Sequence, residues 1–118
     1  MRIDQRECNN VTVLDLDGRM TIEMESPDKP VSATVRRLLA EGRTRVLVNL
    51  ARVPQVDTMG LTEIVEAYLT TTRQGGVLKL EHPSPQVREL LRVTRLSAVL
   101  VVFDSEAEAL ASFQEPAS

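Results

Sequence analysis

The sequence has few of the side chains that build metal, redox or nucleic-acid sites. It contains one cysteine, one histidine and no tryptophan, and aromatic residues make up 3% of its 118 residues. A single cysteine, Cys8, cannot form an internal disulfide, and with His82 as the one histidine no Cys/His zinc cluster can form. So few aromatic rings leave no stacking platform for single-stranded nucleic acid. The composition therefore predicts a protein without a cofactor or a metal.

The sequence also lacks a basic surplus and a long apolar run. Fourteen Lys and Arg against 17 Asp and Glu give a net charge of -3 and a pI of 5.2, which argues against direct nucleic-acid binding. With no apolar run of about 18 residues and no charged-then-apolar leader, we expect no membrane span, no signal peptide and, by default, a cytoplasmic protein. Hydrophobic residues make up 42% of the chain, which is enough for one core. We expect a single domain over residues 1–114 and a frayed tail over residues 115–118.

A β-α-β unit lies at the centre of the sequence. Residues 46–50 are a short apolar run rich in β-branched side chains, which is typical of a central parallel strand covered on both faces. Residues 58–74 have a helical spacing of apolar side chains and end at Gly75-Gly76, and residues 77–80 form the next strand. The crossover between the two strands should be right-handed. The predicted inward face of the helix consists of Leu61, Ile64, Val65, Tyr68, Leu69 and Thr72.

The flanking elements follow from the same signals of periodicity, caps and turns. They are a weak edge strand at 2–9, a strand at 11–16, a loop at 20–30, a helix from about 30 to 42, a helix after Ser84-Pro85, a last buried strand at 99–103, and a helix opened by Ser105 with Ala107, Leu110 and Ala111 facing inward. Together these elements predict an α/β fold with a mixed sheet of four to five strands and about four helices.

The candidate site is the start of the central helix. Asp57 and Thr58 lie just beyond the carboxyl end of a strand, where open α/β sheets tend to bind ligands. Either residue can be the N-cap, and the free N–H groups of the first turn would tolerate an anion such as a phosphate on Thr58. On spacing alone, a cap and a tight turn are the simpler explanation of the same residues.

The residues around this site resemble a known family. The run Val-Asp-Thr-Met-Gly-Leu over residues 56–61, with its preceding strand and following Gly-Gly-Val-Leu-Lys-Leu, resembles the STAS domain of bacterial anti-sigma factor antagonists. The resemblance extends from residue 11 to about residue 113 and implies a STAS-like mixed sheet around the β-α-β unit. The chain departs from the family pattern at Thr58, which replaces the usual Ser, at Met59, which replaces a second small hydroxyl residue, and in a longer connection over residues 19–30.

The resemblance implies a binding protein and not an enzyme. In the family, the first hydroxyl after the Asp is phosphorylated by the partner, an anti-sigma factor serine/threonine kinase, and a separate phosphatase removes the phosphate. Thr58 is then the phosphorylation site, and Asp57, Thr58, Met59, Gly60 and Leu61 are the partner-binding residues. Phosphorylation would switch off sequestration of the kinase. The alternative is a non-switching STAS subunit of a larger signalling assembly or of a lipid-transport complex.

Two other clusters have both a functional and a structural interpretation. Asp15 and Asp17 share one strand face and could form a carboxylate pair for acid-base catalysis, although exposed acids usually only interact with water. Arg88, Arg92 and Arg95 are spaced as one helix ridge, which could contact an acidic partner or lipid headgroup, or simply face solvent.

A small enzyme is a third functional class, although the sequence contains no Walker-type loop and no Cys/His pair near a nucleophile.

Overall fold

One mixed sheet of five strands forms the centre of the fold. The computed structural model describes residues 2–20 and 30–114, so the predicted loop is described only at its ends and the tail at 115–118 lies outside the described residues. The strands run in the order β1-β2-β3-β4-β5 across the sheet, where β1 is antiparallel to β2 and the other pairs are parallel. They are β1 (Arg2–Cys8), β2 (Val11–Asp17), β3 (Arg45–Arg52), β4 (Val77–Glu81) and β5 (Val102–Phe103). The predicted mixed sheet and the central parallel strand are confirmed.

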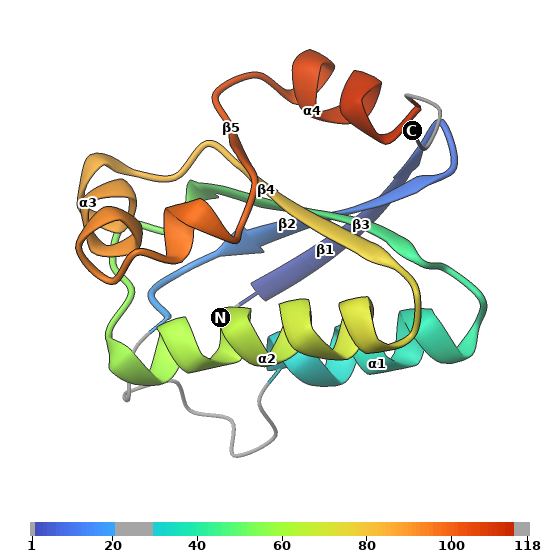
Figure 1. The fold of residues 1–118 in the computed structure, drawn as a ribbon, viewed down its shortest axis with the longest axis horizontal. Coiled ribbons are helices and arrows are strands. Elements are labelled where there is room, and N and C mark those ends of the chain that lie inside the picture. Colours follow the sequence, from blue (N-terminus) through green and yellow to red (C-terminus); the bar gives the residue numbers. More distant parts are fainter. Residues whose placement is uncertain (1, 21–29, 115–118) are drawn as a thin grey trace.

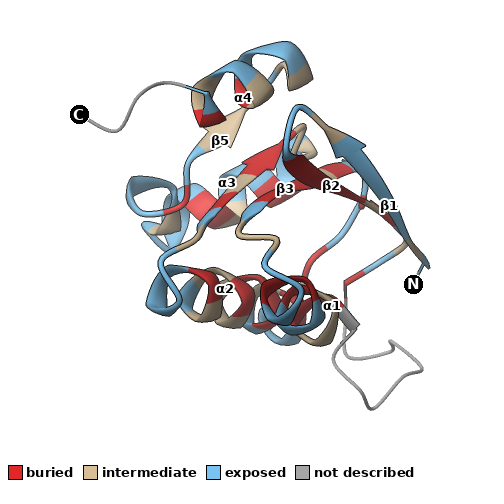
Figure 2. Cartoon of the chain, turned by 90° about the vertical axis from the view of Figure 1, so that its right-hand side faces the viewer, coloured by how far each residue is buried: buried red, intermediate tan, exposed pale blue. Residues whose placement is uncertain are grey.

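Helices cover both faces of this sheet. They are α1 (Pro30–Ala40), α2 (Thr58–Arg73), α3 (Pro85–Val93) and α4 (Glu106–Phe113), with a 3₁₀ turn at Leu96–Ala98. Helices α1 and α2 lie side by side against one face and α4 lies against the other, as Figure 1 shows. Figure 2 shows buried residues on the sheet and on the sides of α1 and α2 that face it.

The alternation of side chains along β2 divides the core into two clusters. Leu14 and Leu16 point toward α1 and α2 and belong to the larger cluster, whereas Val11 and Val13 point toward α4. Strand β3 contributes to both clusters, because Leu47 faces α4 while its neighbours face α1 and α2. Burial on both faces explains why β3 is an unbroken apolar run in the sequence.

The predicted caps of α3 and α4 are confirmed. The Ser84 hydroxyl accepts a hydrogen bond from Val87 N at 3.2 Å, and Pro85 occupies the first helical position. The Ser105 hydroxyl accepts from Glu108 N at 3.3 Å. Each hydroxyl satisfies one of the N–H groups that the first helical turn leaves unpaired.

The predicted inward face of α2 is correct in part: Ile64 is buried and Leu61 and Tyr68 pack against the larger core cluster, but the buried line of the helix is rotated from the predicted one. Leu69 and Thr72 are exposed, and the buried line is Gly60, Glu63, Ile64, Ala67 and Thr71. The reason is that the residues on the buried line are small or have their polar groups hydrogen-bonded, so α2 can approach its neighbours closely. The Thr71 hydroxyl, for example, donates a hydrogen bond to Ala67 O at 2.7 Å.

Three flanking predictions also need correction. The edge strand predicted as weak is the seven-residue β1, since it pairs with β2 along its whole length. The strand predicted at 99–103 shortens to β5, with Val99 and Val101 about half exposed, because the 3₁₀ turn occupies the preceding residues. In α4 the buried residues are Ala109 and Phe113, with Leu110 half-buried, and the predicted Ala107 and Ala111 are exposed.

A buried carboxylate on α2 holds the amino end of α1. Glu63 is 3% exposed, and its Oε1 accepts hydrogen bonds from Val31 N at 3.2 Å and Ser32 N at 3.5 Å. Its Oε2 accepts from the Ser32 hydroxyl at 3.2 Å. Glu63 therefore supplies a negative charge to the positive end of the α1 dipole, and it does so from a neighbouring helix.

Replacing Glu63 by alanine should destabilise the fold, because it removes the buried carboxylate that accepts hydrogen bonds from Val31 N, Ser32 N and the Ser32 hydroxyl. We expect a loss of about 2–3 kcal/mol in the free energy of unfolding, measured by urea denaturation. The matched control Glu89→Ala removes an exposed carboxylate that pairs with Arg92, and it should leave stability nearly unchanged, because exposed ion pairs contribute little. Equal effects of the two substitutions would contradict the capping role.

Candidate functional site

The candidate site is the turn that leads from β3 into α2. Asp57 is the N-cap of α2, with φ -97° and ψ -172°, and its Oδ1 accepts a hydrogen bond from Gly60 N at 3.0 Å. Its carbonyl accepts from Leu61 N at 2.8 Å, which begins the helical hydrogen-bond pattern. Of the two predicted cap residues, the structure thus selects Asp57, and Thr58 becomes the first residue of the helix.

Thr58 and Met59 are the exposed part of this turn. Thr58 lies at the helix N-terminus, where the backbone dipole favours a negative group, and its carbonyl accepts from the Thr62 hydroxyl at 2.8 Å. The Met59 side chain is 51% exposed, which is unusual for a large apolar residue. Leu61 is half-buried and packs against the larger core cluster. The turn therefore presents a hydroxyl and an apolar side chain on a fixed backbone.

Gly60, in the first turn of α2, lies directly against Met20, which follows β2. A Cβ placed on Gly60 would lie 2.0 Å from the carbonyl oxygen of Met20, so no other residue fits here without a shift of the backbone. Met20 N donates to Gln55 O at 2.9 Å, and Asp57 N donates to Met20 O at 3.0 Å. The Met20 backbone is therefore enclosed between the turn and the first turn of α2.

Sequence reasoning did not indicate Met20 or Glu63, although Met20 contacts the five predicted site residues and Glu63 lies in the helix that they begin. The five residues are contiguous, and the structure places all of them in the last residue of the turn and the first turn of α2. Met20 follows β2 in a segment that the sequence predicts as loop, and a buried glutamate on an amphipathic helix resembles any surface glutamate. Neither residue has a local signal, because the role of each depends on a contact with a distant segment.

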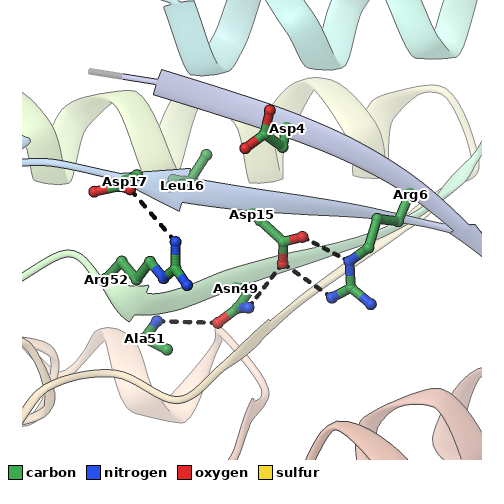
Figure 3. A pocket seen from close by; sticks show the side chains of 8 residues that line it. All are labelled: Asp4, Arg6, Asp15, Leu16, Asp17, Asn49, Ala51 and Arg52. Carbon is green, nitrogen blue, oxygen red and sulfur yellow. Dashed lines mark hydrogen bonds and ion pairs between the residues drawn. The ribbon is translucent and has the colours of Figure 1, made fainter.

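The carboxylate pair predicted at Asp15 and Asp17 does not form a shared acid-base site. Both residues line a cavity of about 280 Å³ on the sheet face opposite α1 and α2. Figure 3 shows the side chains that line it. Asp15 Oδ2 accepts from Arg6 Nε at 2.6 Å, and this contact, together with a bond from Asn49, holds the pKa of Asp15 below its usual range. Asp17 faces Arg52 at 3.7 Å. Each carboxylate thus has its own cation and neither is positioned to transfer a proton to the other.

The predicted arginine ridge is not one helix face. Helix α3 ends at Val93, so Arg95 lies beyond it, with a left-handed backbone at φ +63°. Arg88 pairs with Asp104, and Arg92 pairs with Glu89. These two arginines are therefore neutralised by acids of the same surface.

The described residues contain no group of three or more side chains suited to hold a metal ion. Within the same residues, no helix combines the length and the apolar character needed to cross a bilayer.

The sequence profile of the STAS domain matches residues 2–109 of this chain. The chain belongs to the STAS domain family. A Thermotoga neapolitana protein, provisionally named an anti-sigma factor antagonist and TM1081 homologue, is 29% identical over 76 residues, which cover 64% of this chain and 67% of that protein.

Solved STAS domain structures share the fold. A Thermotoga maritima protein, provisionally named an anti-sigma factor antagonist, has a TM-score of 0.80 at 20% identity, and the alignment covers 93% of this chain and 92% of that one. The Bacillus cell fate determinant SpoIIAA, solved in its phosphorylated form, has a TM-score of 0.72 at 17% identity. The alignment covers 96% of this chain and 100% of that one. At these identities the likeness establishes the arrangement of strands and helices.

Replacing Gly60 by alanine should destabilise the STAS domain, because the new methyl group would overlap the Met20 carbonyl oxygen. We expect a loss of about 3 kcal/mol in the free energy of unfolding, measured by chemical denaturation. Thr58→Ala, a change at an exposed position two residues earlier, should alter stability by less than about 0.5 kcal/mol and serves as the control. A Gly60→Ala protein as stable as the wild type would show that the close approach to Met20 is absent in solution.

Proposed function

We propose that this STAS domain is an anti-sigma factor antagonist that binds an anti-sigma factor kinase through Asp57, Thr58, Met59, Gly60 and Leu61, and that phosphorylation of Thr58 switches the binding off. The observation that carries the proposal is the exposed Thr58 hydroxyl at the first position of a capped helix. The names of the relatives as anti-sigma factor antagonists support the same assignment.

The physical basis of the switch is local. A phosphate adds a charge of about -1.5 to -2 and three acceptor oxygens to a surface that would otherwise be covered by the partner. The helix N-terminus tolerates this charge, because the dipole and the free N–H groups of the first turn favour an anion. Phosphorylation should therefore weaken binding without unfolding the domain.

In this proposal the catalytic steps belong to other proteins. The anti-sigma factor kinase would phosphorylate Thr58, a separate phosphatase would remove the phosphate, and the STAS domain would act as a cytoplasmic binding protein with no catalytic residues. Release of a sigma factor would follow when the antagonist occupies the kinase. The chain would regulate transcription in this way without contacting nucleic acid.

The alternative is a subunit that docks permanently through the same turn, in a signalling assembly or a lipid-transport complex. Met59 favours it, since a large apolar side chain that is 51% exposed adds buried area to a stable interface. In this case Thr58 would be a structural part of the helix start, and its modification would not be needed.

A pull-down from native lysate with wild-type, Thr58→Ala and Thr58→Glu baits separates the two functions. We expect wild type and Thr58→Ala to retain a kinase-like protein identified by mass spectrometry, and Thr58→Glu to lose it, because a carboxylate places negative charge where the partner would bind. Retention of one non-kinase partner by all three baits would replace the switch with the permanent subunit.

The unfolding midpoint of each bait provides the control for this experiment. Thr58→Glu should unfold within a few degrees of wild type, since the first turn of a helix favours an acidic residue. A collapsed midpoint would mean that lost binding reports lost structure, and it would contradict the local switch.

A further inference from the structure

A buried glutamate lies on the sheet face opposite Thr58 and takes no part in the proposed switch. Glu81, the last residue of β4, is 0% exposed, and its Oε1 lies 2.9 Å from His82 Nδ1. Its Oε2 is enclosed and accepts no hydrogen bond from a donor among the described residues, so only a protonated Glu81 can make a hydrogen bond there, with the Glu106 carboxylate as its partner. An ionised carboxylate with one unpaired buried oxygen is costly, whereas a protonated one is tolerated.

The first turn of α4 lies over this glutamate. Arg6 of β1 donates to both carboxylate oxygens of Glu106 at 3.0 and 3.1 Å and to both oxygens of Asp15 at 2.6 and 2.9 Å. One guanidinium therefore joins the edge strand, β2 and the amino end of α4. Its positive charge holds the pKa of Glu106 below the usual range, so Glu106 is an anion near Glu81.

Burial raises the pKa of Glu81 from 4.5 to about 7. The hydrogen bond with His82 opposes this rise, and the negative charge of Glu106 adds to it. Glu81 thus exchanges its proton in the neutral range, at the place where α4 begins.

The rest of α4 is attached through one small apolar cluster. Ala109 and Phe113 pack on Val11, Val13 and Leu47, and the partly buried Cys8, Phe103 and Leu110 pack against these five residues. Lys79 Nζ donates to the Ser112 hydroxyl at 2.8 Å and lies 4.7 Å from the centre of the Phe113 ring. A short helix held by one small cluster can open without unfolding of the sheet.

We propose that α4 is a proton-controlled cover, which stays closed over the far face of the sheet while Glu81 holds a proton and opens when Glu81 becomes an anion beside Glu106. Opening would expose an apolar surface on the face opposite α1 and α2, as the layers in Figure 1 show. The device goes beyond the proposed function and does not depend on it.

The charges around Glu81 set the direction of the effect. The charged or titratable side chains nearby are Glu106 from α4, His82 next in the chain, Lys79 on the same face of β4, and Arg6 and Asp15 from β1 and β2. Arg6 and Lys79 each have another partner, and His82 donates to one Glu81 oxygen only, so the new anion is stabilised by His82 but remains buried and is repelled by Glu106.

Linkage gives the pH window for this cover. A group whose pKa is higher in the closed state than in the open state stabilises the closed state. The stabilisation is complete when the pH is below the open-state pKa, and it is lost as the pH rises to the closed-state pKa. The opening equilibrium should therefore grow between pH of about 5 and 7 and level off above that. Below this window Asp15 and Glu106 lose their pairing with Arg6, so closure is tightest near its acidic end.

Amide hydrogen exchange of the intact chain tests the cover. Exchange rates are measured for the helical amides at 109–113 and, as the reference, for the amides of β3. Dividing each observed exchange rate by the intrinsic exchange rate at the same pH gives the opening equilibrium constant of that amide. We expect opening of α4 to increase at least about tenfold between pH 5 and 8 in wild type, with β3 changing less. In Glu81→Gln, which keeps the shape and removes the charge, the increase should fall below about twofold.

Two further measurements keep this test decisive. Glu89→Gln, the exposed control on α3, should retain the wild-type pH dependence, and a carbon-13 titration of the Glu81 carboxyl in wild type reports its protonation directly. Persistence of the pH dependence in Glu81→Gln, equal changes in α4 and β3, or a Glu81 carboxyl that titrates near its usual value would each overturn the proposal.

Discussion

The close contact between Gly60 and the Met20 backbone is the constraint on which the candidate site depends. It allows the end of the extended segment after β2 to lie directly against the first turn of α2. The two hydrogen bonds between Met20 and the turn then fix the backbone at Asp57, whose side chain caps the helix. A helix start that is held from both sides can present Thr58 and Met59 in one orientation, and a preordered surface loses less entropy on binding.

The two faces of the sheet serve different purposes in this account. Helices α1 and α2 cover the larger core cluster, and Glu63 joins them by capping α1 from α2. The opposite face has a smaller cluster under α4 and a network of charges around Arg6. The face that carries Thr58 is therefore closed by apolar packing and a satisfied carboxylate, whereas the other face is closed in part by titratable groups.

Local signals in the sequence predicted most of the fold. Strand β3, both ends of α2 to within a residue, and the serine caps of α3 and α4 follow from apolar runs, glycine stops and capping residues. The rotation of α2 could not be predicted, because it depends on the small Ala67 and on a buried Glu63 whose partners are distant in sequence. At the site, Asp57 and Thr58 were visible as a cap and a helix start, whereas the need for glycine at position 60 comes from Met20 alone. Glu81 has no local signal either, because its burial depends on contacts that form only in the folded chain.

The most direct test of the central claim is the affinity of the purified domain for its anti-sigma factor kinase, with and without phosphothreonine at position 58. Isothermal titration calorimetry of the two forms, with their unfolding midpoints measured alongside, compares binding at equal folding. The account predicts that phosphorylation weakens binding at least about tenfold while the midpoint stays nearly unchanged. Equal affinities of the two folded forms would contradict it.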